Sequence, residues 1–247
     1  YRTNGPIGRD LVFNTAYERI LAHNGIESIR MAGSQQDFWE KLRALNLFII
    51  RWRQDDSHHQ LVSDLLPVVE KELGVDCFPN LATCWHYDDK IKQYLLLAHR
   101  GFPVVKSYIF WEREKALAWA RDAAYPLVFK LRGGAGSENV ILVKNQAQAV
   151  KLIDRMFGRG IRPENFVHSG SVRFQHFNLY REFHHLCGNL YRRFRGLDPS
   201  PCWRTHKNYA LFQEVIPDNT FDTRVTVIGE RAFIFRRLVR DGDFLAF

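Results

Sequence analysis

The sequence predicts a protein of mixed α/β and α+β class, and three observations support this class. Up to about Thr83, helix patterns alternate with short apolar runs, which indicates a small parallel α/β domain. The segment 125–143 then reads as a strand, a glycine-rich turn and a second strand. Three more strand patterns follow from 211 onward, after a long section without regular pattern.

The first segment predicts helices where apolar residues recur at helical spacing and strands where apolar runs are short. The helix over 37–44 has Asp37 as its expected N-terminal cap, and the continuous apolar run over 45–50 is typical of a buried parallel strand. The expected elements are a helix over 16–23, a strand over 26–30, a helix over 37–44, a strand over 45–50, a helix over 60–73 and a strand over 75–78.

The rest of the chain predicts helices packed on hairpins. We expect helices over 88–99, 113–124 and 146–157, a strand over 104–110, and strands over 211–216, 222–228 and 232–237. These patterns predict three domains: a small α/β domain over 1–85, a lid-like subdomain over 86–158, and 159–247, which holds a basic section and the start of a C-terminal subdomain.

Composition is that of a soluble globular protein, with 247 residues, 46% hydrophobic and 25% charged. No apolar run approaches the roughly 18–20 residues that span a bilayer. The four cysteines form no CxxC pair, which indicates a reducing, cytoplasmic setting. A zinc site from Cys77, Cys84 and His86 is the less favoured alternative to buried thiols.

The net charge of +8 is concentrated in the section from Arg159 to Asn208, which carries nine basic residues against three acidic ones. Aromatic residues alternate with the arginines, as in stacking platforms for nucleic acid. The section could therefore contact a polyanion, an acceptor substrate or a second copy of the chain. The alternative is that the aromatic residues belong to a core and the arginines to a solvated rim.

The most informative motif is Tyr125-Pro-Leu-Val-Phe-Lys-Leu-Arg-Gly-Gly-Ala-Gly-Ser137. It places Lys130 at the end of an apolar strand, directly before a glycine-rich turn. Backbone N–H groups of such a turn, with a lysine beside them, suit the phosphates of a nucleotide. The turn lacks the Walker and GxGxxG patterns, so a plain hairpin loop and a solvated Lys130 remain alternatives.

Several blocks in order resemble the ATP-grasp superfamily, and within it the RimK-like branch of ribosomal-protein glutamate ligases and glutathione synthetase-like enzymes. The blocks are Lys90 at a helix start, the Lys130 hairpin, Gln213-Glu-Val-Ile216, Asp222-Thr-Arg224, Arg236-Arg237 and Asp241-Gly-Asp-Phe244. The resemblance covers almost the whole chain and implies an ATP-grasp fold with an N-terminal pre-ATP-grasp domain.

The resemblance also implies roles for individual residues. Lys90 and Lys130 would bind the nucleotide phosphates beneath a lid formed by Gly133, Gly134, Gly136 and Ser137. Glu214 and the backbone of Val215 would meet the adenine, Asp222 the ribose, and Arg224 and Arg237 the phosphate or acyl-phosphate charge. The family's magnesium ligands would lie beyond Phe247, so we expect a piece of a longer protein.

The function expected from this resemblance is ATP-dependent ligation of a carboxylate to an amine or thiol through an acyl phosphate, with ATP and Mg²⁺ as cofactors. The alternatives are a nucleic-acid or polyanion-binding module and an ATP-binding pseudoenzyme. Asp222 and Arg224 lie on one face of a strand and could simply pair with each other. His58-His59 and Trp85-His86 are expected to be structural rather than catalytic.

Overall fold

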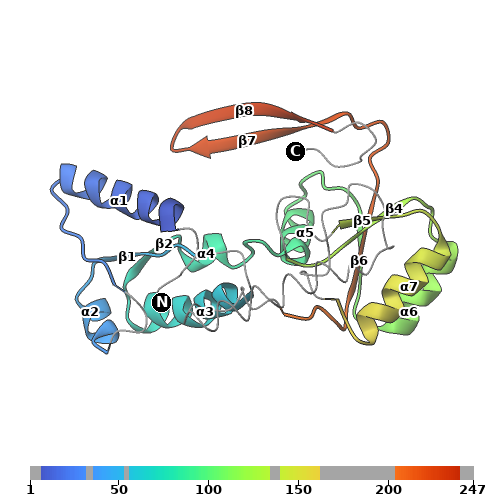
Figure 1. Ribbon diagram of the computed structural model, residues 1–247, viewed down its shortest axis with the longest axis horizontal. Helices are drawn as coiled ribbons and strands as arrows, with labels where there is room; N and C mark the ends of the chain where they lie inside the picture. Colours follow the sequence, from blue (N-terminus) through green and yellow to red (C-terminus); the bar gives the residue numbers. More distant parts are fainter. Residues whose placement is uncertain (1–6, 32–35, 53–55, 134–139, 162–203, 240–247) are drawn as a thin grey trace. The chain divides into compact units, whose positions relative to one another are not determined.

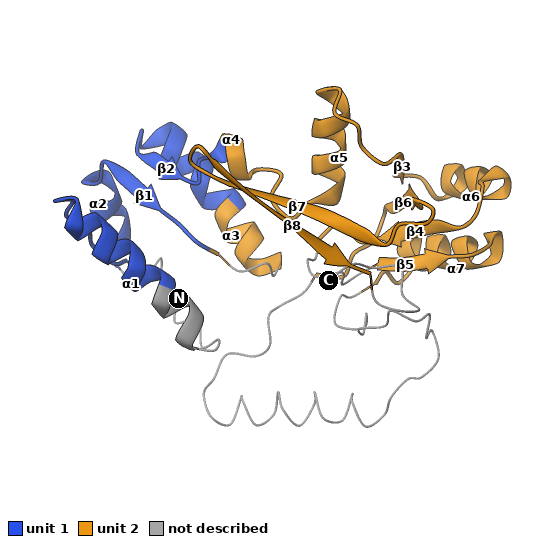
Figure 2. Ribbon diagram, turned by 90° about the horizontal axis from the view of Figure 1, so that it is seen from above, with its two compact units in different colours: residues 1–51, 63–81, 177–201 blue, residues 52–62, 82–176, 202–247 orange. Residues whose placement is uncertain are grey.

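The computed structural model describes residues 7–31, 36–52, 56–133, 140–161 and 204–239. The chain forms two compact units, coloured separately in Figure 2. The first takes its described residues from 1–51 and 63–81, and the second from 52–62, 82–176 and 202–247. The domain bounds expected from the sequence stay predictions.

The first unit contains a parallel pair of strands, as the alternating pattern predicted. β1 (Leu47–Ile49) pairs in parallel with β2 (Asp76–Phe78), and each strand buries only its central residue, Phe48 or Cys77. Helices α1 (Ile7–His23) and α2 (Phe38–Arg43) precede β1. Between the strands run α3 (Asp56–Pro67) and a π-helical turn, η1 (Val68–Glu72).

Two expectations for this segment were wrong. The segment 26–30 forms no strand, and Ile26 and Ile29 are about half exposed, at 53% and 50%. Asp37 occupies the N-cap position of α2, but its carboxylate makes no capping hydrogen bond. It pairs instead with Lys41 one turn later, at 2.8 Å.

The second unit is built on a four-stranded antiparallel sheet in the order β3-β6-β4-β5 (Figure 1). The predicted lysine hairpin is present as β4 (Leu127–Lys130) and β5 (Val140–Val143). β6 (Ala210–Glu214) lies between β4 and β3 (Ser107–Phe110), although more than 60 residues separate β5 from β6 in sequence. The two central strands, β4 and β6, are the more deeply buried.

Helices α6 (Arg113–Asp122) and α7 (Gln146–Phe157) lie side by side against one face of this sheet (Figure 1). Phe129 and Phe212 are directly opposite each other in the strand register, point to that face, and are fully buried with an edge-to-face contact of 5.5 Å. Helix α7 begins at Asn145, whose side chain accepts from the backbone N–H of Gln148. It ends at Phe157, as predicted.

Two helices and a hairpin complete the described chain. α4 (Leu81–Cys84) leads to α5 (Lys90–His99), which lies on the side of the strands away from α6 and α7 (Figure 1). β7 (Phe221–Ile228) and β8 (Arg231–Leu238) form a regular hairpin around Gly229-Glu230. Apolar side chains of this hairpin, among them Val225 and Ile234, are mostly exposed.

Cys77 and Cys84 are free thiols. Among the described residues no helix is both long and apolar enough to cross a membrane.

Candidate functional site

Lys130 ends β4 on the sheet face opposite to Phe129, because side chains alternate along a strand. Its ammonium group donates a hydrogen bond to the side-chain oxygen of Gln213 on the neighbouring strand β6. The amide nitrogen of Gln213 donates in turn to the Ser107 hydroxyl on β3, at 3.0 Å. A chain of neutral partners across three strands thus holds Lys130 in place.

Lys90 is the first residue of α5, and the sequence fixes this helix start through Asp89. The Asp89 carboxylate caps the helix by accepting from the backbone N–H groups of Ile91 and Lys92, at 3.1 and 3.0 Å. The residue before it, Asp88, adopts a left-handed backbone with φ of 51°. The chain therefore turns sharply just before the lysine.

Lys90 and Lys130 influence each other electrostatically. Burial, together with the positive charge of Lys90, lowers the pKa of Lys130 to about 8. Burial also lowers the pKa of Lys90, while the carboxylates of Asp88 and Asp89 act against that shift. Two partly buried cations close together create a local positive potential that favours a bound anion.

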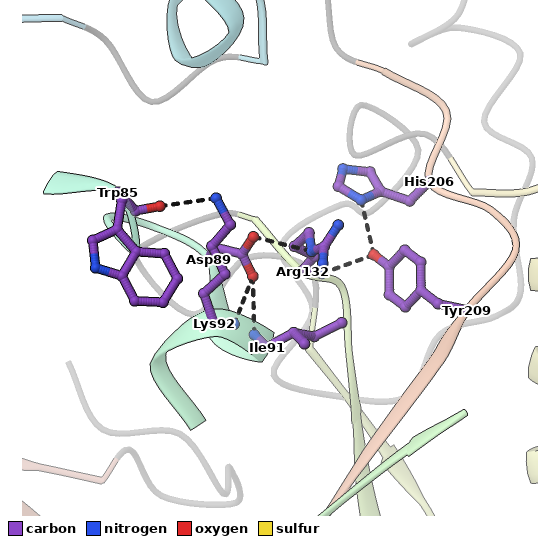
Figure 3. A network of polar contacts seen from close by, with 7 residues as sticks. All are labelled: Trp85, Asp89, Ile91, Lys92, Arg132, His206 and Tyr209. Atoms are coloured by element: carbon purple, nitrogen blue, oxygen red, sulfur yellow. Dashed lines mark hydrogen bonds and ion pairs between the residues drawn. The ribbon is translucent and has the colours of Figure 1, made fainter. Parts of the chain in front are cut away.

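Backbone and side-chain contacts join the start of α5 to the end of the lysine strand. The backbone N–H of Lys90 donates to the carbonyl of Arg132, at 2.9 Å. The Arg132 guanidinium lies 3.0 Å from the Asp89 carboxylate, so one carboxylate both caps α5 and pairs with the arginine (Figure 3). The two lysines are thereby held on two elements that are locked together.

A second set of contacts ties Arg132 to the strand β6 (Figure 3). The backbone N–H of Arg132 donates to the Tyr209 hydroxyl oxygen, at 2.8 Å. The same oxygen lies 2.8 Å from Nδ1 of His206. Burial raises the pKa of Tyr209 and lowers the pKa of His206, so both side chains are neutral at pH 7.

The segment that carries His206 is anchored by a close backbone approach. Ile161, just after α7, exchanges two backbone hydrogen bonds with His206, both of 2.8 Å. Gly160 makes this possible: its φ is +78°, and an added Cβ would lie 2.5 Å from the Thr205 side chain. The backbone of His206 is therefore held by Ile161, a residue that is distant from it in the sequence.

The lid expected over the phosphates is described only at its first residue. Gly133 follows Arg132, and an added Cβ there would lie 3.7 Å from the Asp88 carbonyl, which is ordinary contact. Gly134, Gly136 and Ser137 lie outside the described residues. Their role over a phosphate stays a prediction.

Glu214 ends the strand β6 and Val215 follows it, and the side chain of Glu214 lies on the helix-covered face. It accepts a hydrogen bond of 2.8 Å from the Tyr108 hydroxyl. Together with Trp119 and Tyr125, these residues line a pocket of about 240 Å³. Because Gln213 and Glu214 point to opposite faces, this pocket and the Lys130 side chain lie on different sides of the sheet.

Asp222, Arg224 and Arg237 lie on the hairpin of β7 and β8. Asp222 and Arg237 are directly opposite each other, and the Arg237 guanidinium forms two hydrogen bonds to the Asp222 carboxylate. This pair lowers the pKa of Asp222 and raises that of Arg237. Asp222 therefore pairs across the hairpin with Arg237, whereas the sequence had suggested Arg224 as the partner.

The histidines singled out in the sequence pack against aromatic rings. His59 stacks on Tyr87 with ring centroids 5.5 Å apart, and His86 meets Trp85 edge-on. The described residues contain no group of three or more His, Cys, Asp or Glu side chains that could hold a metal ion. Most of the basic section falls in 162–203, outside the described residues, so its polyanion contact stays a prediction.

Sequence reasoning missed Gln213, Arg132, His206 and Tyr209 as parts of this site. Gln213 belongs to the block Gln213-Glu-Val-Ile216, and its position next to Glu214 on a predicted strand could have indicated that it lies near the site. Arg132 and Tyr209 are 77 positions apart, and no local pattern indicates that they meet.

Comparison with solved structures finds a similarity to a RimK-domain ATP-grasp protein from Sphaerobacter thermophilus DSM 20745, with a TM-score of 0.40 and 15% sequence identity. The match covers 73% of this chain, which spans half of the length of that protein. No family model matches the chain, and the comparison with curated proteins finds no match.

Proposed function

We propose that this chain binds the phosphates of ATP through Lys90 and Lys130, as part of an ATP-grasp protein that activates a carboxylate. The observation that carries the proposal is the pair of partly buried lysines on two elements locked together by Asp89 and Arg132. A polyphosphate supplies the negative charge that such a pair favours. The proposal rests on these contacts, because a likeness at a TM-score of 0.40 gives no residue correspondence.

The chemistry that follows from this proposal is phosphoryl transfer to a carboxylate. The two ammonium groups would hold phosphate oxygens and offset the charge that builds on them, which is most of what a protein contributes to this reaction. The neutral partner Gln213 leaves the full charge of Lys130 for the ligand. ATP supplies the phosphoryl group that activates the carboxylate for attack by an amine or thiol.

Residues fitting the phosphates are present, whereas a magnesium ligand set is not found within the described part of the chain. No step is therefore assigned to a metal. The carboxylate substrate, the cytoplasmic setting and a homo-oligomer stay predictions, as do the adenine, ribose and acyl-phosphate roles of Glu214, Val215, Asp222, Arg224 and Arg237.

The test is calorimetric titration of MgATP into the chain and into the variant Lys130→Met, which keeps the apolar stem and removes the charge. The matched control is Lys115→Met, because Lys115 is an exposed lysine of α6 that pairs with Glu112. We expect binding at least tenfold weaker in Lys130→Met, since a charge-assisted contact contributes about 1.5–3 kcal/mol. Equal affinity in all three proteins, or no binding in any, would contradict the proposal.

A second readout separates an enzyme from a binding protein of the same fold. ADP release in the presence of candidate carboxylates and amines would support the ligase. Saturable MgATP binding that depends on Lys130 but yields no ADP would instead support the pseudoenzyme.

A further inference from the structure

The contacts around Tyr209 form a directional chain of hydrogen bonds (Figure 3). The hydroxyl oxygen of Tyr209 accepts from the backbone N–H of Arg132, at 2.8 Å. It also lies 2.8 Å from His206 Nδ1, and Nε2 of the same ring is 3.8 Å from the Asp56 carboxylate. Tyr209 and His206 are 4% and 9% exposed, so water does not replace these contacts.

We assign the donors and acceptors by placing the imidazole proton on Nε2, the nitrogen nearer to the Asp56 carboxylate. Nδ1 then accepts the hydrogen bond of the Tyr209 hydroxyl, whose oxygen in turn accepts from the backbone N–H of Arg132. Burial lowers the pKa of His206, the Asp56 carboxylate acts against that shift, and the positive charges of Arg132, Lys90 and Arg204 add to it.

We propose that Tyr209 and His206 are positioning residues for the lysine pair. They hold the main chain of Arg132 in the place from which its carbonyl binds the backbone N–H of Lys90, at 2.9 Å. Lys130 ends β4 two residues before Arg132, so we infer that the same contact sets the separation of the two ammonium groups. The inference rests on the proposed function and adds which residues maintain the separation of Lys90 and Lys130 in the proposed anion site.

The positioning role follows from the charges involved. Lys90 and Lys130 repel each other and would move apart if the strand end were free to shift. Replacing the Tyr209 hydroxyl leaves a partly buried backbone N–H of Arg132 without its acceptor, which is the costly kind of hydrogen-bond loss. The main chain at Arg132 is then expected to shift, because the contact that ties it to Tyr209 is lost.

The experiment compares Tyr209→Phe and His206→Leu with Tyr17→Phe. Tyr17 is the control because it is a partly exposed tyrosine of α1, in the first compact unit, and is assigned no part in the proposed site. MgATP affinity is measured by calorimetry, and the pKa of Lys130 by NMR titration of its side chain. The second readout reports how deeply Lys130 is buried and how close Lys90 lies to it, and not stability as such.

We expect roughly tenfold weaker MgATP binding in Tyr209→Phe and His206→Leu, with the control unchanged. The pKa of Lys130 is expected to rise from about 8 towards the ordinary lysine value in both variants. His206→Gln retains a side-chain acceptor for the Tyr209 hydroxyl and is expected to restore part of both effects. It also decides the question if Tyr209→Phe fails to fold.

Folded Tyr209→Phe or His206→Leu protein with an unchanged Lys130 titration and unchanged affinity would overturn the inference. So would a His206→Gln variant that behaves as His206→Leu does. Wild-type protein that binds no MgATP, but whose Lys130 titration shifts in Tyr209→Phe, would support the positioning role and contradict only the proposed function.

Discussion

The ammonium group of Lys130 donates a hydrogen bond to the side-chain oxygen of Gln213, and this partner is neutral. A structural lysine at a partly buried position usually meets a carboxylate, because an uncompensated charge is costly to bury. Because the Gln213 side chain is an uncharged amide, it does not neutralise the positive charge of Lys130 on this face of the sheet. The neutral partner Gln213 therefore agrees with the proposed anion site, whereas a carboxylate at this position would form an internal ion pair.

The first prediction concerns this amide. Gln213→Glu places a carboxylate beside Lys130 and is expected to raise the pKa of the lysine and to stabilise the fold above pH 5. The internal ion pair would compete with phosphate, so MgATP affinity is expected to fall roughly tenfold. Thermal unfolding and calorimetry measure the two effects. A variant that binds MgATP as tightly as the wild type would show that Lys130 does not face the ligand.

The second prediction is a pH dependence that follows from the pKa of Lys130, which is about 8. Below pH 8 the folded protein carries this proton, and above pH 8 it progressively loses it, while the unfolded chain keeps it up to about pH 10.4. MgATP affinity is therefore expected to decline as the pH rises from 7 to 9.5. Lys130→Arg keeps its charge over this range, and its affinity is expected to stay nearly constant.

The same titration has an opposite effect on stability. Between pH 8 and about 10.4 the unfolded chain binds more protons at this position than the folded chain does, so this group makes the protein more stable as the pH rises. Chemical denaturation at several pH values checks the sign, by comparing wild type with Lys130→Met. If the free energies of unfolding of wild type and Lys130→Met differ by the same amount at every pH, the lowered pKa of Lys130 is contradicted.

The third prediction concerns the Asp222–Arg237 pair. The pair lies on a hairpin and both side chains are partly solvent-exposed, so Asp222→Asn is expected to change the stability by less than about 1 kcal/mol. If Asp222 binds the ribose, as the family resemblance implies, the same variant weakens MgATP binding without lowering the melting temperature. Arg236→Met removes a neighbouring charge on β8, leaves the pair in place and provides the control. Equal losses of affinity in both variants would point to the charge of the hairpin rather than to Asp222.

The fourth prediction tests the core beneath the site. Phe129 and Phe212 are fully buried against each other on the helix-covered face, so Phe129→Ala is expected to destabilise the fold by about 3–5 kcal/mol. Phe102→Ala is the control, because that ring is 58% exposed. Urea unfolding measures both. A small loss in Phe129→Ala would show that this sheet face is not the centre of the core.

Local patterns predicted those elements whose signals are themselves local. Helix α7 was predicted over 146–157 from its helical pattern and from the glycine that follows it, and the lysine hairpin because an apolar run meets a glycine-rich turn. The strand expected over 26–30 failed because a strand needs a partner, and the apolar residues of that segment stay exposed. Strand β6 lies between β3 and β4, although it is far from both in the sequence. No periodic pattern along the chain could have predicted this pairing.

The candidate site divides in the same way. Lys90 and Lys130 could be selected from their positions at a helix start and a strand end. The contact of Arg132 with Tyr209 could not, because it depends on how β6 enters the sheet. The candidate ligand-binding residues lie in motifs that can be recognised in the sequence. The residues that hold them in place come together only when the chain folds.

The double role of Asp89 has a consequence for protein engineering. The Asp89 carboxylate caps α5 and also pairs with Arg132, which follows β4. The start of α5 and the end of β4 therefore form one structural unit and cannot be exchanged separately. A designer who moved residues 88–92 into another scaffold would have to move 130–132 with them. Transplanting either piece alone would leave a helix without its orientation or an arginine without its counter-charge.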